Sequence, residues 1–291
     1  MFKNPEDSAI SAVLALSLEV SGNPKAGNVD REHDFEDLKY EDFLISAITA
    51  FPYFLKTAKK GEMYLSEAIA KGREYGVKTN VHFGAFLLLF PLVTAWRSEN
   101  CEVAGKNATE FLKNTSHLES LRILKAFQLC NPRVLKTGEM SLESKRTEME
   151  IIKRKINVYE WMKLAPKENL IAFELLNEYK ISVEGAKFLL DLKKERNESV
   201  VLLYHKLLAS YPDTLIVAKR GMEMAIEVMK LARKVLEKND PMEFRKLDDF
   251  LLKDDLNPGT IADLTASSIY LALLEGWKFE IEGLWIEKRN K

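Results

Sequence analysis

Leu256-Asn-Pro-Gly-Thr-Ile-Ala-Asp263 begins the segment that decides the fold class of this chain. Asn257 is a good N-cap and Pro258 suits the first position of a helix, so a helix is predicted over Pro258–Glu275. The residues that surround Asp263 on this helix are apolar. A helix that is apolar on nearly all of its faces is buried among other elements, so we expect a helical core.

Helical periodicity extends from this segment through most of the chain, and no run alternates well enough to support a sheet. We therefore predict an all-α protein in which residues 1–291 form a single domain of about a dozen helices. The charged segment Met140–Lys163 is predicted as a solvated helix, and the tail Trp277–Ile286 as a short strand or an extended arm. The other predicted helices are Pro5–Val20, Glu41–Lys59, Glu62–Tyr75, His82–Trp96, Val103–Lys113, Ser116–Leu129, Glu168–Tyr179, Val183–Ser210, Leu215–Glu237 and Met242–Leu252.

The charge balance excludes a bulk electrostatic attraction to nucleic acid or to a membrane. The chain has 43 basic and 44 acidic residues among 291, a net charge of −1. Any site for an anion must therefore be local. The longest mostly apolar stretch, Phe83–Trp96, is shorter than the roughly 20 residues that cross a bilayer. We expect neither nucleic acid nor a membrane as a partner.

Cysteine usage and the amino terminus predict a cytoplasmic protein. Cys101 and Cys130 form no CxxC pair and have no metal-ligand spacing, which favours reduced thiols. No basic-then-apolar signal peptide is apparent at the amino terminus. Gln128 is the only glutamine in a chain rich in Lys and Glu, a composition typical of thermophiles.

The C-terminal motif combines a helix start with a carboxylate. Gly259 and Thr260 would expose backbone N–H groups at the N-terminus of the helix, where phosphate binds well. Asp263 shares a face with Ser267 and Tyr270 on an apolar helix. A carboxylate in such a place needs a partner, a metal or a catalytic task. The alternative is an ordinary capped helix in which Asp263 bonds to a neighbour.

The N-terminal motif places charged residues around a tight turn. Glu19 ends a very apolar helix, and Pro24-Lys-Ala-Gly27 and Asp30-Arg31 follow it. Lys25 and Arg31 are candidates for phosphate binding, and Glu19 or Asp30 for metal binding or proton transfer. The alternative is a loop in which Glu19 is neutralised by one of the two cations.

Two further motifs lie between these ends. Lys78, Asn80 and His82 come just before a helix that Asn80 can cap, and Gly84 lets another backbone approach. A single histidine at such a place is more often structural than catalytic. Farther along the chain, Asp213 or Thr214 can cap a helix whose next turn carries Lys219 and Arg220, although this pattern is usually a solvated helix start.

Together these segments resemble the triphosphoribosyl-dephospho-CoA synthase family. The matching stretches, in the order of the family, are Glu19–Arg31, Gly76–Gly84, Pro212–Leu215 and Leu256–Asp263. The resemblance implies an all-helical enzyme that transfers the 5-triphosphoribosyl group of ATP to the 2′-hydroxyl of 3′-dephospho-CoA and releases adenine. The product is the precursor of the prosthetic group of citrate or malonate lyase-type enzymes.

This reaction needs groups for the triphosphate, for the reacting sugar carbon and for the leaving base. Carboxylates are expected near the sugar carbon, either directly or through Mg²⁺, and the candidates are Glu19, Asp30 and Asp263. His82 or Asn80 would assist the base. The candidates for binding ATP are Lys25, Arg31, Lys78, Asn80, Lys219, Arg220, Asn257, Gly259 and Thr260, and the active site would lie between the N- and C-terminal motifs.

The chain departs from the family pattern in two places, both near the expected site. Many members have Gly-Ala-His-x-Asp-Met where this chain has the shorter and more acidic segment Glu32–Lys39, and many have Lys where it has Phe83. Two alternatives therefore stay open. One is a related ATP-dependent glycosyl or phosphoryl transferase that acts on another cofactor precursor, and the other is a non-catalytic nucleotide-binding helical protein. The oligomeric state does not follow from the sequence.

Overall fold

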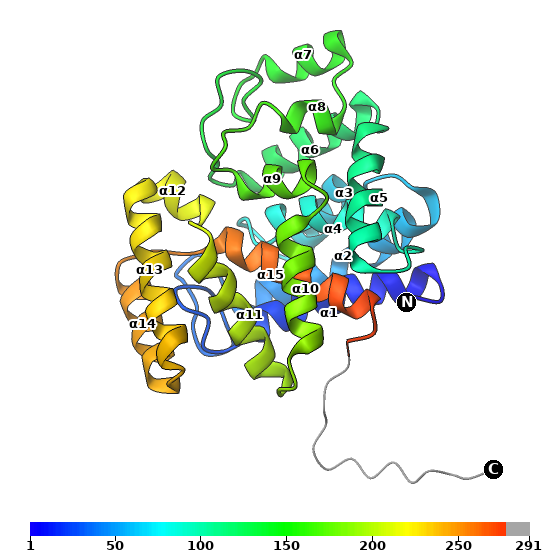
Figure 1. Cartoon of the computed structure of the whole chain (residues 1–291). Coiled ribbons are helices and arrows are strands. Elements are labelled where there is room, and N and C mark those ends of the chain that lie inside the picture. Colours follow the sequence, from blue (N-terminus) through cyan, green and yellow to red (C-terminus); the bar gives the residue numbers. More distant parts are fainter. Residues whose placement is uncertain (278–291) are drawn as a thin grey trace, which may run out of the picture.

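The computed structural model describes residues 1–277, and within them all regular structure is α-helical (Figure 1). The all-α prediction is confirmed. The predicted tail Trp277–Ile286 lies outside the described residues, apart from Trp277 itself. The helices are α1 (Pro5–Ser21), α2 (Tyr40–Lys60), α3 (Leu65–Glu74), α4 (Phe83–Thr94), α5 (Cys101–Lys113), α6 (His117–Cys130), α7 (Thr147–Arg154), α8 (Val158–Met162), α9 (Leu170–Leu176), α10 (Lys180–Asp191), α11 (Arg196–Ser210), α12 (Thr214–Arg220), α13 (Met222–Lys238), α14 (Pro241–Lys253) and α15 (Gly259–Leu274).

Two helices that the periodicity predicts as continuous are each broken in two. The predicted helix Leu215–Glu237 divides into α12 and α13 at Gly221, whose φ of 88° is readily adopted only by glycine. The predicted helix Val183–Ser210 divides into α10 and α11 because Leu192 is extended (φ −84°, ψ 116°). The break turns the chain so that both α10 and α11 pack against α15.

The prediction of one solvated helix over Met140–Lys163 is wrong. The chain is irregular as far as Arg146 and then forms the short helices α7 and α8. Lys155, with φ of 49°, ends α7. Ile151 and Trp161 turn into the core, at 0% and 5% exposed, so the charged residues cover a buried apolar side rather than a fully solvated helix.

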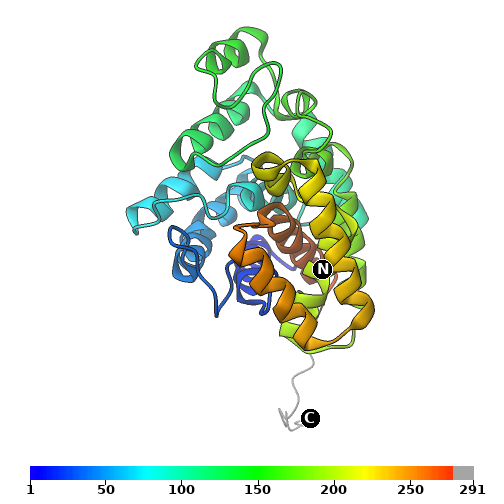
Figure 2. The same cartoon turned by 90° about the vertical axis from the view of Figure 1, so that its left-hand side faces the viewer.

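The core is built around α15, which packs against α1, α4, α10 and α11. Nearly every residue of α15 is buried, as its apolar sequence predicts. The first helix lies beside the last in both views of the molecule (Figure 1, Figure 2). The hydroxyls of Ser8 and Tyr270, at 2.8 Å, connect α1 to α15 inside the core.

The N- and C-terminal motifs meet, as a site shared between them requires. Asn28 Nδ2 donates to Asn257 Oδ1 at 3.1 Å. Gly27, at φ 71°, lies so close to the C-terminal motif that a Cβ there would be 2.4 Å from the carbonyl oxygen of Leu256. The packing of the two ends of the chain therefore depends on a glycine in this turn.

Two pairs of helices lie far from each other at the edge of this helical core. α7 and α8 lie at one end of the molecule, away from α13 and α14 (Figure 1, Figure 2).

Among the described helices, no single one is long and apolar enough to cross a membrane, although the bent pair of α11 and α12 meets that criterion by length and composition.

Candidate active site

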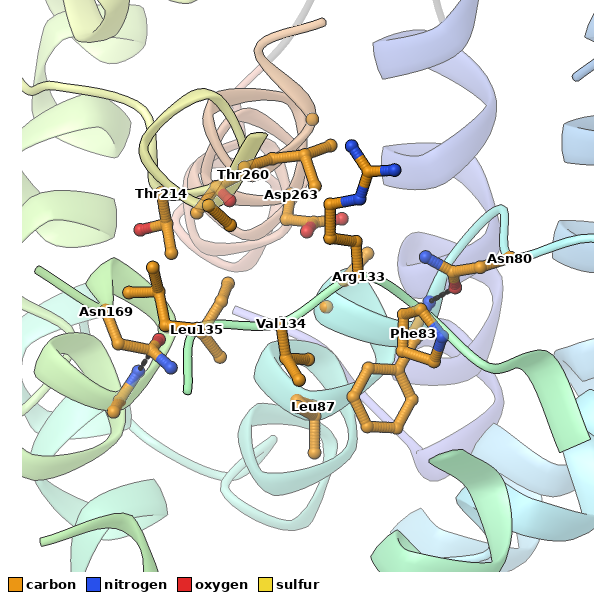
Figure 3. A pocket seen from close by; sticks show the side chains of 18 of the residues that line it. Asn80, Phe83, Leu87, Arg133, Val134, Leu135, Asn169, Thr214, Thr260 and Asp263 are labelled. Atoms are coloured by element: carbon orange, nitrogen blue, oxygen red, sulfur yellow. Dashed lines mark hydrogen bonds between the residues drawn. The ribbon is translucent and has the colours of Figure 1, made fainter. Parts of the chain in front are cut away.

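A cavity lies where the N-terminal parts of α4, α12 and α15 approach the end of α1. Its polar end is formed by Glu19, Asn28, His82, Asn257 and Asp263. Apolar residues of α4, α6, α8 and α9 line the other end. The irregular segment after α6 runs across the cavity, and Figure 3 shows its Arg133, Val134 and Leu135 between Asp263 and Leu87.

Asp263 enters this cavity against the first turn of α4. The backbone N–H of Ala85 donates to its carboxylate. A Cβ on Gly84 would be 2.0 Å from Asp263 Oδ2, so only glycine leaves room for the carboxylate. Gly84 thus admits a carboxylate, whereas the sequence predicts the approach of a backbone. Burial, and then the nearby charge of Glu19, raises the pKa of Asp263 well above its usual range.

Glu19 comes from the last turn of α1 and forms a buried ion pair with Lys25. The two side chains are 4% and 0% exposed. Burial raises the pKa of Glu19, while the Lys25 ammonium acts in the opposite direction. Lys25 does not line the cavity, so its charge is directed at Glu19 rather than at an open phosphate site. This pairing is the alternative that the sequence leaves open for the N-terminal motif.

His82 lines the cavity with both ring nitrogens unpartnered among the described residues. The ring packs edge-on against Phe43 and lies beside Phe86. Burial lowers the pKa of His82 to about 3, so the imidazole is neutral at physiological pH. Two buried ring nitrogens without partners indicate a place for a polar ligand.

Asn80 and the C-terminal motif also lie at the cavity, with capping roles that differ in part from the predictions. Asn80 Oδ1 accepts from Phe83 N, the first residue of α4, at 3.1 Å, so Asn80 contributes to the predicted cap although the N-cap residue itself is His82. The predicted N-cap role of Asn257 is wrong, because Pro258 is the capping residue of α15 and Asn257 instead accepts from Asn28. Gly259 and Thr260 line the cavity at the start of α15.

The start of α15 already has an anion, the carboxylate of Asp213. Its two oxygens accept from Ile216 N of α12 and Ile261 N of α15, each at 2.9 Å. Asp213 is 1% exposed, and burial raises its pKa to about 6 although four backbone N–H groups oppose the shift. The predicted cap of α12 is confirmed. The Asp213 carboxylate therefore accepts from backbone N–H groups at the start of α15, where the sequence analysis expects phosphate to bind.

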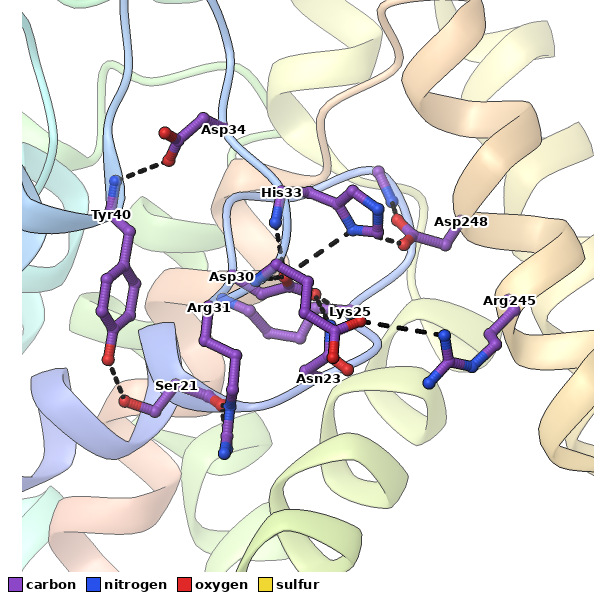
Figure 4. Close-up of polar contacts among 12 residues, drawn as sticks. Ser21, Asn23, Lys25, Asp30, Arg31, His33, Asp34, Tyr40, Arg245 and Asp248 are labelled. Carbon is purple, nitrogen blue, oxygen red and sulfur yellow. Dashed lines mark hydrogen bonds and ion pairs between the residues drawn. The ribbon is translucent and has the colours of Figure 1, made fainter.

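Asp30 organises its loop and does not reach the cavity. Asp30 Oδ1 accepts from the backbone of Glu32 and His33, and Oδ2 from Asn23 Nδ2 and Lys25 N, at 2.8 to 3.2 Å (Figure 4). His33 Nδ1 lies 3.7 Å from Asp30 Oδ1 and 3.1 Å from Asp248 Oδ2, so these three residues could be mistaken for a metal site. Four donors occupy all the lone pairs of a carboxylate, which leaves none for a metal ion.

The other cations expected to bind phosphate are also outside the cavity lining. Arg31 donates to the carbonyl of Ser21 and to Asn197. Lys219 and Arg220 donate to the carbonyls of Asp255 and Asp254, just beyond α14. Lys78 is exposed in its loop. The geometry therefore gathers Glu19, Asn80, His82, Asn257, Gly259, Thr260 and Asp263 from the predicted set, and leaves Lys25, Asp30, Arg31, Lys78, Lys219 and Arg220 apart.

One functional candidate was missed by the sequence analysis. Arg133 lines the cavity, and no other Lys or Arg among the described residues does so. It follows Asn131-Pro132, which indicates only where α6 stops. The available signal was a basic residue directly after a helix stop in a segment without regular structure.

Comparisons with known proteins agree on one family. The profile of the ATP:dephospho-CoA triphosphoribosyl transferase family matches residues 5–280. The chain belongs to this family. A solved structure from Archaeoglobus fulgidus, provisionally named a triphosphoribosyl-dephospho-CoA synthase, is 45% identical, with a TM-score of 0.71. The similarity covers 81% of this chain and 100% of the other. Among curated proteins, none matches.

Membership of the triphosphoribosyl transferase family makes this protein a transferase whose substrates are ATP and dephospho-CoA. The family resemblance that the motifs indicate is thereby confirmed. The residues that perform the reaction are assigned below from the geometry of the cavity.

Proposed function

We propose that the polar end of the cavity is where the triphosphoribosyl group passes from ATP to the 2′-hydroxyl of 3′-dephospho-CoA. One observation carries this assignment. Glu19 and Asp263, from opposite ends of the chain, converge there beside His82, whose ring nitrogens have no partner among the described residues. Two carboxylates that flank a reacting sugar are the usual means of stabilising an oxocarbenium-like transition state.

The transfer exchanges one bond at the anomeric carbon for another. The bond from C1′ to N9 of adenine breaks, and the bond from C1′ to the acceptor oxygen forms. The departing base takes up a proton, and the acceptor hydroxyl loses one. The site therefore has to stabilise positive charge on the sugar, accept the hydroxyl proton and support the leaving base.

Asp263 is proposed to accept the hydroxyl proton. Its carboxylate has one described backbone donor and no cation partner, and burial raises its pKa. A raised pKa makes a carboxylate a stronger proton acceptor, so the direction of this shift suits the role of a base.

Glu19 is proposed to stabilise the positive sugar carbon. The buried Lys25 ammonium favours the ionised form of Glu19 and holds it at the cavity wall. Glu19 would thus remain an anion while Asp263 exchanges its proton, a division of roles that their different partners support.

His82 and Asn80 are proposed to bind the leaving adenine. With its pKa lowered to about 3, His82 is neutral and can act only through hydrogen bonds, one donated and one accepted. The oxygen of Asn80 bonds to Phe83 N, which leaves its amide hydrogens for the base. An adenine placed here would satisfy the two ring nitrogens of His82.

The residues at the cavity fit Mg²⁺ only in part. Glu19 and Asp263 are the carboxylates that would hold the ion together with phosphate oxygens, whereas Asp30 has no free lone pair. Bound there, Mg²⁺ would neutralise part of the triphosphate charge. Since Cys101 and Cys130 are free thiols, we also propose a cytoplasmic location.

The deciding experiment is chromatographic detection of adenine from the full-length chain with ATP and Mg²⁺, with and without dephospho-CoA. We expect adenine only when dephospho-CoA is present, together with a product heavier by one triphosphoribosyl group. Adenine formed only after a metabolite extract is added would point to another acceptor. Binding of ATP with no adenine under any condition would contradict the proposal and favour a nucleotide-binding protein.

Asp263→Asn tests the proposed base. We expect kcat to fall by roughly 10²- to 10⁴-fold, the usual contribution of a general base, while the protein stays folded because the substitution removes a charge from a buried place. Asp248→Asn is the matched control, since Asp248 is a buried carboxyl away from the cavity lining. Wild-type turnover by Asp263→Asn would exclude the role.

A further inference from the structure

The segment from Asn131 to Leu142, which we name the strap, crosses the cavity without regular structure. Val134, Leu135 and Leu142 face the cavity with apolar side chains, and Pro132 is buried. The strap thus contributes to the wall of the proposed active site although it belongs to none of the sequence motifs.

The backbone of the strap is hydrogen-bonded near its two ends and not between them. At its start, Asn131 adopts the left-handed conformation and donates its N–H to the carbonyl of Phe127 at 2.7 Å. Toward its end, Trp161 Nε1 donates to the carbonyl of Met140 at 3.0 Å. Between these points, the backbone of residues 132–139 makes no hydrogen bond with any described residue. Few hydrogen bonds are a property of segments that rearrange around ligands.

Two polar side chains of the strap face the cavity without partners. Arg133 is an exposed side chain that lines the cavity (Figure 3), and no hydrogen bond or ion pair joins it to another described residue. The Oγ1 atom of Thr137 is buried and has no hydrogen-bond partner among the described residues. A buried hydroxyl and a free guanidinium on one segment offer donors for the same anion.

The charges that line the cavity favour Arg133 as the partner of a polyphosphate. Its lining contains the carboxylates Glu19, Glu139 and Asp263, and within the described chain only the one cation, Arg133. The cations suggested by the motifs bond elsewhere, as Lys25 does to Glu19. Glu19 is paired with Lys25 and Glu139 with Arg154, so the only cation of the described lining that a triphosphate could contact directly is Arg133.

We infer that Arg133, supported by Thr137, binds the triphosphate of the ATP substrate and brings the strap down over it. This inference deepens the proposed function and rests on it. Arginine binds phosphate through two parallel N–H donors, which positions the group as well as neutralising it. A strap fixed by this contact excludes water from the sugar carbon.

Binding of inorganic tripolyphosphate, measured by calorimetry on the full-length chain, tests the inference without requiring turnover. We expect Arg133→Ala to weaken tripolyphosphate binding about 10- to 100-fold, the effect of losing a charged hydrogen-bonding group, and Arg133→Lys to weaken it less. Lys136→Ala is the matched control: Lys136 is an exposed cation of the same strap that does not line the cavity, so binding should be unchanged. Adenosine binding should be the same in all four proteins.

Hydrogen exchange gives a second readout. The amides of residues 133–139 should exchange more slowly with tripolyphosphate in the wild type and in Lys136→Ala, but not in Arg133→Ala. Equal tripolyphosphate binding by wild type and Arg133→Ala, an equal loss in Lys136→Ala, or no binding by the wild type would each overturn the inference. Failure of the proposed function has a different signature, in which the wild type binds tripolyphosphate as expected but releases no adenine.

Discussion

Two irregular segments border the cavity, and they are held in opposite ways. The first loop, Gly22–Lys39, is fixed by many polar contacts, with four donors on Asp30 alone. The strap has few such contacts and turns apolar side chains and Arg133 to the cavity. The difference teaches that charged residues in a dense motif can be structural, while a segment without a motif can carry the free charge.

The largest effect is expected from Asp30→Ala in the first loop. The change leaves Asn23 Nδ2 and three backbone N–H groups without their acceptor, which should lower the free energy of unfolding by about 3–5 kcal/mol. Denaturant titration measures it. In the control Asp34→Ala, which removes an exposed acceptor for Tyr40 N, the loss should be below about 1 kcal/mol. Similar losses in the two variants would remove the contrast between a fixed loop and the strap.

Gly84→Ala tests whether activity depends on the position of the Asp263 carboxylate. The new Cβ would occupy the position of Asp263 Oδ2, so the carboxylate must move, and a displacement of about 1 Å commonly costs roughly 10²-fold in rate. We expect kcat/KM for adenine release to fall by at least that factor. In Gly72→Ala the nearest atom would be 3.7 Å away, so activity should persist and α3 should gain about 0.5–1 kcal/mol. Full activity of Gly84→Ala would show that Asp263 need not occupy this place.

The pH dependence of stability should be a property of the framework and not of the strap. The pKa of Asp213 is about 6 in the folded protein, against 3.8 as its ordinary value, so the folded state retains a proton that the unfolded state has lost. Asp213 should therefore contribute a fall in stability of on the order of 1–3 kcal/mol as pH rises from about 4 to about 6, against an opposite contribution from the buried His82 and His205, whose pKa values are lowered to about 3 and about 4. Thermal unfolding over this range measures it.

Asp213→Asn should remove the falling contribution from that profile, because asparagine cannot ionise. Asp240→Asn serves as the comparison, since Asp240 caps α14 at an exposed position. The one glutamate of the strap, Glu139, is exposed and should contribute little. A profile that keeps its slope in Asp213→Asn would assign the pH dependence to other groups.

The smallest effect is expected from loosening the strap. Trp161→Phe removes the hydrogen bond to the carbonyl of Met140 and should cost about 1 kcal/mol of stability while raising KM for ATP a few-fold. Trp96→Phe loses an equivalent buried bond, to the carbonyl of Ala58, far along the chain from the strap. It should match the loss of stability with no change in KM. If KM also rose in Trp96→Phe, the effect would be general destabilisation.

The sequence predicted the fold where burial alone decides it. α1 and α15 are apolar on most faces, and such helices can only be internal. The prediction from sequence was less accurate where backbone geometry decides the boundaries of a helix. Periodicity continues through Gly221 and Leu192, and the breaks there depend on how the following helices pack against α15 and one another.

The site was predictable for carboxylates and less so for cations. Glu19 and Asp263 stand out because an apolar helix makes a charge conspicuous. Lys25 and Arg31 stand out equally, yet only the folded chain shows that their partners are Glu19 and Ser21 rather than a substrate. Arg133 has no such local sign, because its place at the cavity arises from the path of the strap between α6 and α8.

The pairing of α1 with α15 has a consequence for how the protein is made. Ser8 is bonded to Tyr270, which the ribosome adds 262 residues later. An apolar first helix must therefore wait through nearly all of synthesis before its neighbour emerges, and contacts so distant in sequence form slowly. A nascent chain cannot assemble Glu19 with Asp263 until α15 is released, so translation products that lack α15 would release no adenine at this site and would leave the apolar α1 exposed.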